Sequence, residues 1–239
     1  NITTYQLYNV LAYRPVSYDP SADLENSLVD EDVTDINDVR FNPIITNDNE
    51  YRQIRTTNTM ANVYLEIKPI DGLVFLTNGT MSLRNKEQEV FHNSLTQEGS
   101  SLNPRNNRGQ WGAVNEYKRE IWSSESTLTY DKCLDLKHNI NAGAGASFQK
   151  GTNVGKGFTS ANVPNEELGI SGLDEGVLVN SISESSTYTM ASFFGRINYN
   201  YDSKYLFTAT WRADGSSRFS KYNRWAYFPS AALAWTCPI

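Results

Sequence analysis

Few side chains in this sequence have the type and spacing needed for chemistry. His92 and His138 are its only histidines, and neither lies in a recognisable catalytic triad or in the spacing of a metal site. The two cysteines, Cys133 and Cys237, form no C-x-x-C pair; a disulfide between them would require an oxidising compartment. We therefore expect no enzyme activity, no metal and no cofactor.

The densest group of acidic side chains could suggest a calcium loop. An EF-hand loop that began at Asp30 would need glycine at its sixth position and glutamate at its twelfth. Those positions hold Asp35 and Phe41. The sequence between Asp30 and Asp38 is therefore interpreted as an acidic, solvated loop.

A second charged group consists of Arg212, Asp214, Arg218 and Arg224. It could form a site at the mouth of a lumen or facing a partner, or it could be a salt-linked loop that joins two strands. Because Arg212 and Asp214 are two residues apart and share a strand face, we favour the structural role.

Several aromatic residues are expected in or beside one long loop: Phe91, Trp111, Tyr117 and Trp122. Sugar rings stack on exposed aromatic faces, so a glycan contact is one interpretation. Loop packing and an interface with another protein are the others, and the sequence leaves all three open. The candidate substrate or partner contacts are Trp111, Tyr117, Trp122, Arg218 and Arg224.

The elements that would position these residues are β-strands. Apolar and polar residues alternate with period two in 191–201, in 205–213 and in 231–235. Similar hairpins are expected from 62–68 with 73–83, and from 121–130 with 137–149. In total about seven strands are predicted after Tyr51.

The connections between these strands alternate between short and long. Short turns are expected at 69–72, 132–136 and 202–204, and long loops at 84–114, 150–185 and 216–226. Bacterial outer-membrane barrels have this asymmetry, and they carry aromatic residues at both membrane interfaces, where we place the tyrosines that flank the short turns. The predicted fold is therefore all-β: an antiparallel up-and-down meander within a transmembrane β-barrel.

Composition agrees with a barrel. Of 239 residues 39% are hydrophobic, which is low for a soluble core, yet 12% are aromatic, with 14 tyrosines. No apolar run is long enough for a membrane helix. The net charge of −6 and the absence of a basic stripe argue against binding to nucleic acid.

Two regions are expected along the chain. Residues 1–50 form an acidic loop region, with a possible short helix over Thr4–Tyr13 that Pro15 would end. Residues 51–239 form the partial barrel. The first residues lack the pattern of a signal peptide, so we expect either a processed protein or an internal fragment.

Three sequence runs carry a resemblance to a known family: ASFFGRINY at 191–199, RADGSSRF at 212–219 and NRWAYFPS at 223–230. In this order and spacing they resemble the SusC-like, TonB-linked outer-membrane receptors of Bacteroidetes-type bacteria. His138–Asn141, Ser147–Gln149 and Asn42–Ile44 are also similar to that family. The resemblance is strong over 186–235, fair over 42–150 and weak before Asn42.

The resemblance implies a 22-stranded barrel with an N-terminal plug in the outer membrane, in contact with its lipid. Such receptors import glycans or peptides, take energy from the TonB complex through their N-terminal region, and are capped by a SusD-like surface lipoprotein. This sequence shows no plug and no TonB box, and Pro238 falls where the family continues a strand. We therefore expect a fragment that does not transport by itself.

Two other classes of protein remain as alternatives. A soluble β-sandwich carbohydrate-binding module would share the strand pattern. A β-sandwich hydrolase would need paired acidic residues placed for acid–base catalysis, and we find no convincing pair.

Overall fold

The computed structural model describes residues 7, 10–13, 26–30, 39–135 and 137–236 of the chain. Most of the helix expected over Thr4–Tyr13 and the acidic run after Asp30 lie outside these residues. Cys237 and Pro238 also lie outside them, and so does the disulfide considered above. No helix within the described residues is long and apolar enough to cross a membrane.

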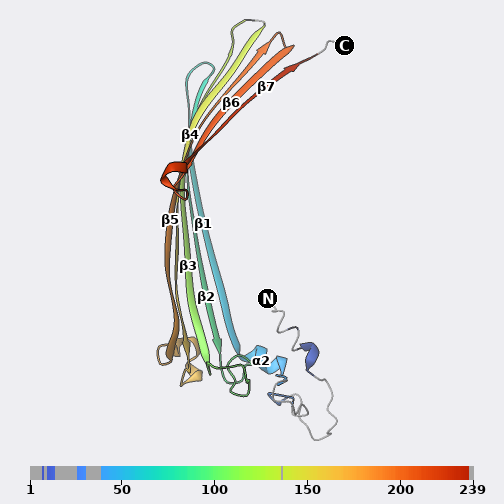
Figure 1. The fold of residues 1–239 in the computed structure, drawn as a ribbon, viewed down its shortest axis with the longest axis vertical. Coiled ribbons are helices and arrows are strands. Elements are labelled where there is room, and N and C mark those ends of the chain that lie inside the picture. The colour runs from blue at the N-terminus through green and yellow to red at the C-terminus, as the bar shows by residue number, and fades with distance from the viewer. Residues whose placement is uncertain (1–6, 8–9, 14–25, 31–38, 136, 237–239) are drawn as a thin grey trace. The chain divides into compact units, whose positions relative to one another are not determined.

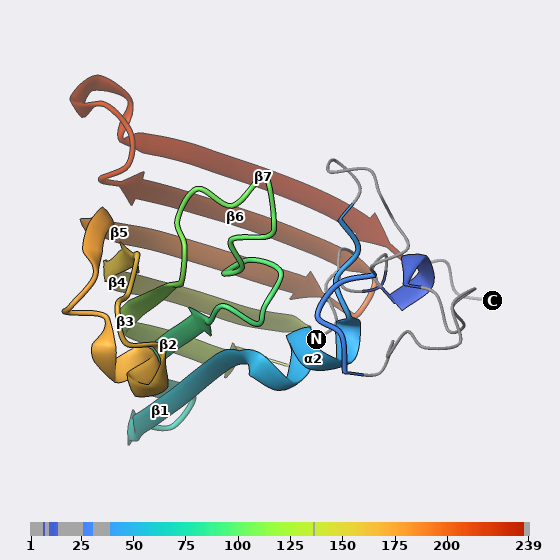
Figure 2. The ribbon, with the colours of Figure 1, turned by 90° about the horizontal axis from the view of Figure 1, so that it is seen from below.

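The described chain forms one seven-stranded sheet in which every strand pairs with its neighbours in sequence, giving the order β1 to β7 (Figures 1 and 2). This confirms the predicted meander and the predicted number of strands. The strands are β1 (Glu50–Ile70), β2 (Leu73–His92), β3 (Trp111–Cys133), β4 (His138–Ala161), β5 (Val177–Tyr201), β6 (Tyr205–Ser216) and β7 (Trp225–Trp235).

A short helix, α2 (Pro43–Asn49), precedes the first strand, in a segment that we expected to be loop. Asn42 begins it: its side-chain oxygen accepts hydrogen bonds from the backbone N–H groups of Ile44 and Ile45, at 3.0 and 3.4 Å. Pro43 occupies the first helical position, where its missing N–H costs nothing. Asn-Pro is thus a helix start that the sequence interpretation missed.

The three short turns lie where the sequence predicted them. Gly72 closes the first with φ of +80°, and a side chain there would overlap the backbone of Asp131. Asp202 and Ser203 take the left-handed conformation in the third, with φ of 52° and 53°. In the second, the backbone N–H of Lys137 donates to Asp135 and holds the pKa of that carboxyl below its usual range.

The long connections are shorter than predicted, because the strands extend further. They span 93–110, 162–176 with the 3-10 helix η1 (Glu166–Gly172), and 217–224 with η2 (Lys221–Asn223). The expectation of loop over 84–92, 111–114, 150–161 and 177–185 was wrong. Strand pairing continues through these residues although apolar and polar side chains do not alternate there.

The described chain divides into two compact units. The first comprises residues up to Thr56 together with 86–117 and 155–184, and its core is Phe91, Val163 and Leu173, packed against Val114 and Ile170. The second comprises 57–85, 118–154 and the residues from Ser185 onward, and consists of sheet. The candidate site lies in the second unit.

Candidate functional site

Strand register sorts the side chains of β5, β6 and β7 onto two faces. Ile197 pairs with Ala209, which pairs with Ala231, and the same face carries most of the large apolar residues of these strands. The opposite face carries the polar residues, with Arg196 opposite Thr210 and Thr210 opposite Ser230. We call these the apolar face and the polar face.

A chain of side-chain hydrogen bonds crosses the polar face. The Asn198 amide donates to Asn141 at 3.1 Å, and its oxygen accepts from Thr208 and from Arg196, both at 3.0 Å. Asn141 in turn donates to Asp131 at 3.1 Å. Each such bond stabilises the fold by about 0.5–1.5 kcal/mol, and together they fix the register of strands β3 to β6.

Two aromatic rings lie flat on the polar face because β4 has glycine beneath them. A methyl group at Gly145 would lie 2.5 Å from the Phe194 ring and 2.9 Å from the backbone oxygen of Ser126. A methyl group at Gly151 would overlap the Tyr188 ring. These glycines therefore provide the space that the two rings occupy.

An arginine side chain packs over each of these two rings. The Arg218 guanidinium lies 4.1 Å from the centroid of Tyr188, and that of Arg212 lies 5.9 Å from the centroid of Phe194. Arg212 also donates from Nε to both carboxylate oxygens of Asp214, at 2.9 Å. The expected pairing along one strand face is thus present, and it joins residues of one strand instead of two.

This arrangement suits binding rather than catalysis. Guanidinium groups held on aromatic rings, beside amide and hydroxyl groups, can donate hydrogen bonds to hydroxyl, carbonyl or carboxylate oxygens of a polar solute. Within the described residues no cluster of His, Cys, Asp and Glu could hold a metal ion.

The apolar face carries two rows of rings. The first row lies at the short turns, where His138 contacts Tyr199 and Tyr201, and Tyr201 stacks on Tyr205. The second row lies about ten residues along the strands, where Phe148, Phe193 and Trp225 contact one another in succession. Between the rows the strands carry mainly small and aliphatic residues such as Ala209 and Ala231, together with Trp211, which stacks on Tyr227.

The five candidate contact residues are placed differently from one another. Trp122 lies inside β3, within the strand predicted over 121–130, and Tyr117 lies in the same strand, which begins earlier than predicted. Trp122 and Arg224 line one hollow on the apolar face. Arg218, in the connection between β6 and β7, is the one that packs on Tyr188 at the polar face.

Trp111 begins β3 in the first unit and is held by packing within that unit. Its ring N–H donates to the backbone oxygen of Glu98 at 3.1 Å. Its ring lies 4.6 Å from that of His92 and 5.1 Å from the Arg108 guanidinium. Of the roles left open by the sequence, loop packing is the one that these contacts support.

Comparison with known proteins decides the family. Residues 1–238 match the family model described as TonB dependent receptor-like, beta-barrel. The chain belongs to this family. Its members are receptors of the outer membrane rather than enzymes, and the chain is an outer-membrane β-barrel segment of the SusC-like type.

Individual relatives agree with this assignment. TonB-dependent receptor P3 of Formosa agariphila is 37% identical over 177 residues, which cover 73% of this chain and 17% of that protein. TonB-dependent receptor SusC of Bacteroides thetaiotaomicron is 64% identical over 47 residues, 20% of this chain and 5% of that protein. The chain therefore spans about a fifth or less of the length of each.

Solved structures support the fold. A chain in the structure of the RagAB peptide transporter superposes with a TM-score of 0.67 at 22% identity. The match covers 82% of this chain and 21% of that one. The RagAB importer in its closed-closed state gives a TM-score of 0.68.

Proposed function

We propose that this chain forms part of the barrel wall of a TonB-dependent nutrient importer, with its polar face toward the passage and its apolar face toward lipid. The observation that carries the proposal is the division of one meander sheet into these two faces. Transmembrane barrels need that division, since their strands alternate between lipid and a polar interior.

The intact receptor must supply the remaining strands of the barrel. Strands β1 and β7 are the outer strands of the described sheet, and an unpaired backbone group in hydrocarbon costs several kcal/mol. The barrel must therefore close with further strands, to the 22 that the family resemblance implies. We assign residues 51–239 to this wall and residues 1–50 to a separate region that precedes it.

The cargo and the partners follow from the same proposal. A glycan or a peptide would pass along the polar face, where the arginines and amides can replace its hydrogen bonds to water. A SusD-like surface lipoprotein would deliver it, and the TonB complex would supply the energy through the N-terminal part of the intact receptor. Tyr117 and Arg218 remain candidate contacts for the cargo or the lipoprotein.

The soluble β-sandwich carbohydrate-binding module is not favoured. A sandwich buries its core between two sheets, and the described strands form one sheet with large apolar side chains exposed, among them Ile197, Trp211 and Leu233. In water that surface would drive aggregation, whereas in a membrane lipid covers it.

Cysteine labelling tests the orientation of the wall. In the intact receptor with Cys133→Ser and Cys237→Ser, we expect Thr210→Cys to react with a membrane-impermeant, water-soluble maleimide. Ala209→Cys, the adjacent residue on the apolar face, should react only with a lipid-soluble maleimide. Labelling of both positions by the water-soluble reagent in intact outer membranes would contradict the proposal.

Uptake tests the activity itself. Deletion of the gene should abolish accumulation of one class of fluorescent oligomer, either oligosaccharides or oligopeptides, and deletion of tonB should have the same effect. The uptake assay also separates the two cargo classes. Unchanged uptake of both classes of oligomer in the strain that lacks the gene would contradict the proposal of an importer.

A further inference from the structure

One hollow on the apolar face has a volume of about 970 Å³. Residues of all seven strands line it, including Val63, Met81, Trp122, Phe148 and Trp225. Its floor includes Gly79, where an added methyl group would meet no atom within 4 Å. The hollow is thus apolar and open on the side that the proposed function turns toward lipid.

Two cations lie at the edge of this hollow. Lys150 follows Phe148 by two residues on the same face of β4, and Arg224 directly precedes Trp225. Neither has a carboxylate partner among the residues that the structure describes. An unpaired lysine and an unpaired arginine beside an apolar hollow therefore offer positive charge to a ligand with an apolar part.

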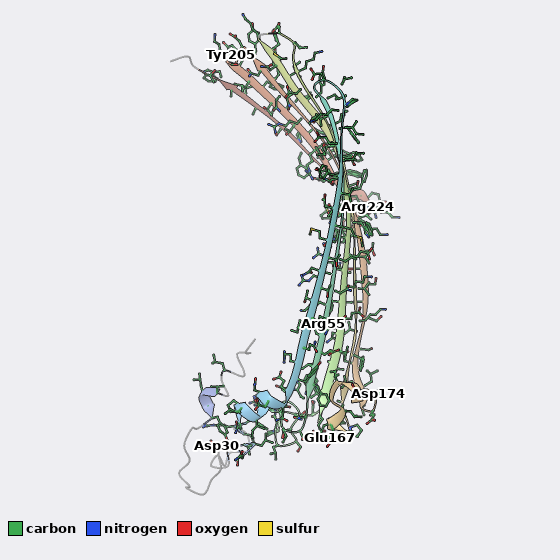
Figure 3. All side chains as sticks on the ribbon, turned by 180° about the vertical axis from the view of Figure 1, so that it is seen from behind. Asp30, Arg55, Glu167, Asp174, Tyr205 and Arg224 are labelled. Atoms are coloured by element: carbon green, nitrogen blue, oxygen red, sulfur yellow. The ribbon has the colours of Figure 1, made fainter. Side chains whose placement is uncertain are left out.

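The hollow lies at the depth of the second row of rings. In β7, Trp225 of the second row lies ten positions before Trp235, at the level of the first row. At a strand tilt near 45°, ten residues span about 23 Å along the bilayer normal. The apolar band of such barrels is ~25 Å tall. Figure 3 places Tyr205 at the turn end of these strands and Arg224 far along them. The cations therefore lie where lipid headgroups begin.

Two smaller hollows on the same face provide a comparison. One, of about 530 Å³, lies beside Ile197 and Trp211, and the other, of about 400 Å³, lies beside Leu233. Neither has an outward-facing cation at its edge, since Arg196, which borders the first, lies on the polar face. The 970 Å³ hollow thus differs from these two by the positive charge at its edge.

We propose that this hollow binds a phosphate-bearing lipid of the outer leaflet, with an acyl chain against Gly79 and Trp122 and a phosphate on Lys150 and Arg224. The inference rests on the proposed function, because it needs this face to contact the membrane. Arginine can hold two phosphate oxygens at once, and lysine adds a point charge. Only a ligand that combines apolar chain with negative charge matches both parts of the hollow.

Native mass spectrometry of the intact receptor tests this with diphosphorylated lipid A as the probe. We expect Lys150→Gln with Arg224→Gln to weaken binding by about tenfold, the loss of two charge-assisted contacts. Dephosphorylated lipid A should bind the unaltered receptor as weakly as diphosphorylated lipid A binds the double variant. Gly79→Leu, whose first side-chain carbon would meet no atom within 4 Å and whose other carbons would occupy the hollow, should weaken binding of both lipids.

Matched variants act as controls. Lys156→Gln removes a lysine from the same face of β4 six residues further on, and Arg105→Gln removes an exposed arginine from the first long loop; together they should leave binding unchanged. Gly195→Leu fills the 530 Å³ hollow instead and should also leave it unchanged. Equal binding of the probe by all these variants would overturn the inference and indicate unspecific annular lipid. Because folding and uptake would then persist, that result leaves the proposed function intact, whereas failure to insert into membranes would contradict both.

Discussion

Ala231→Arg is expected to destabilise the folded barrel by about 2–4 kcal/mol, the cost of arginine on the lipid face at the bilayer midplane. Ala231 lies on the apolar face of β7, six residues from Trp225 and four from Trp235. It is therefore close to the middle of the span between the two rows of rings. A guanidinium there is too far from either interface to reach water without distorting the bilayer.

The adjacent residue is the control. Ala232 is also an exposed alanine of β7, but it pairs with Thr208 on the polar face. Ala232→Arg should change the free energy of unfolding by less than about 1 kcal/mol, because its side chain remains in water. Urea titration of the intact receptor, refolded into lipid vesicles and followed by tryptophan fluorescence, measures both. Equal destabilisation by the two variants would refute the assignment of the faces.

The fold was predicted best where the membrane requires apolar and polar side chains to alternate along a strand. From Ala191 to Trp235, lipid on one side and water on the other force period two, so the three strands and the short turn between the first two were predicted correctly. Beyond the second row of rings, toward the long loops, β4 and β5 continue with polar residues on both faces. There Thr152 bonds Thr187 and Asn153 bonds Ser186 across the pair, and no hydrophobic period marks the strand.

The candidate site was harder to predict than the fold. Trp122 was placed correctly in a strand, but the sequence did not indicate that it lines the same hollow as Arg224, a residue far away along the chain. The packing of Phe194 and Tyr188 on glycine was missed altogether. Its signal was present: Gly143, Gly145 and Gly151 occupy one face of a strand, where glycine lowers β-propensity and needs a structural reason.

The packing of the Phe194 ring on Gly145 predicts a large loss of stability when a side chain is added there. Gly145→Val should destabilise the barrel by about 1–3 kcal/mol, the usual cost of overpacking. The first carbon of the new side chain would lie 2.5 Å from the Phe194 ring and 2.9 Å from the backbone oxygen of Ser126. The ring can rotate away, and would then release Arg212, but the backbone oxygen can move only with β3.

Gly79→Val is the matched control, because β2 leaves open space at that position, and it should change stability by less than about 0.5 kcal/mol. Phe194→Ala combined with Gly145→Val should recover part of the loss, since it removes the ring but not the contact with Ser126. Gly145→Val, Phe194→Ala and the double variant form a double-mutant cycle in the same urea titration. If Gly145→Val were as stable as Gly79→Val, the Phe194 ring would not be held against β4, and Arg212 would lack the support that orients it on the polar face.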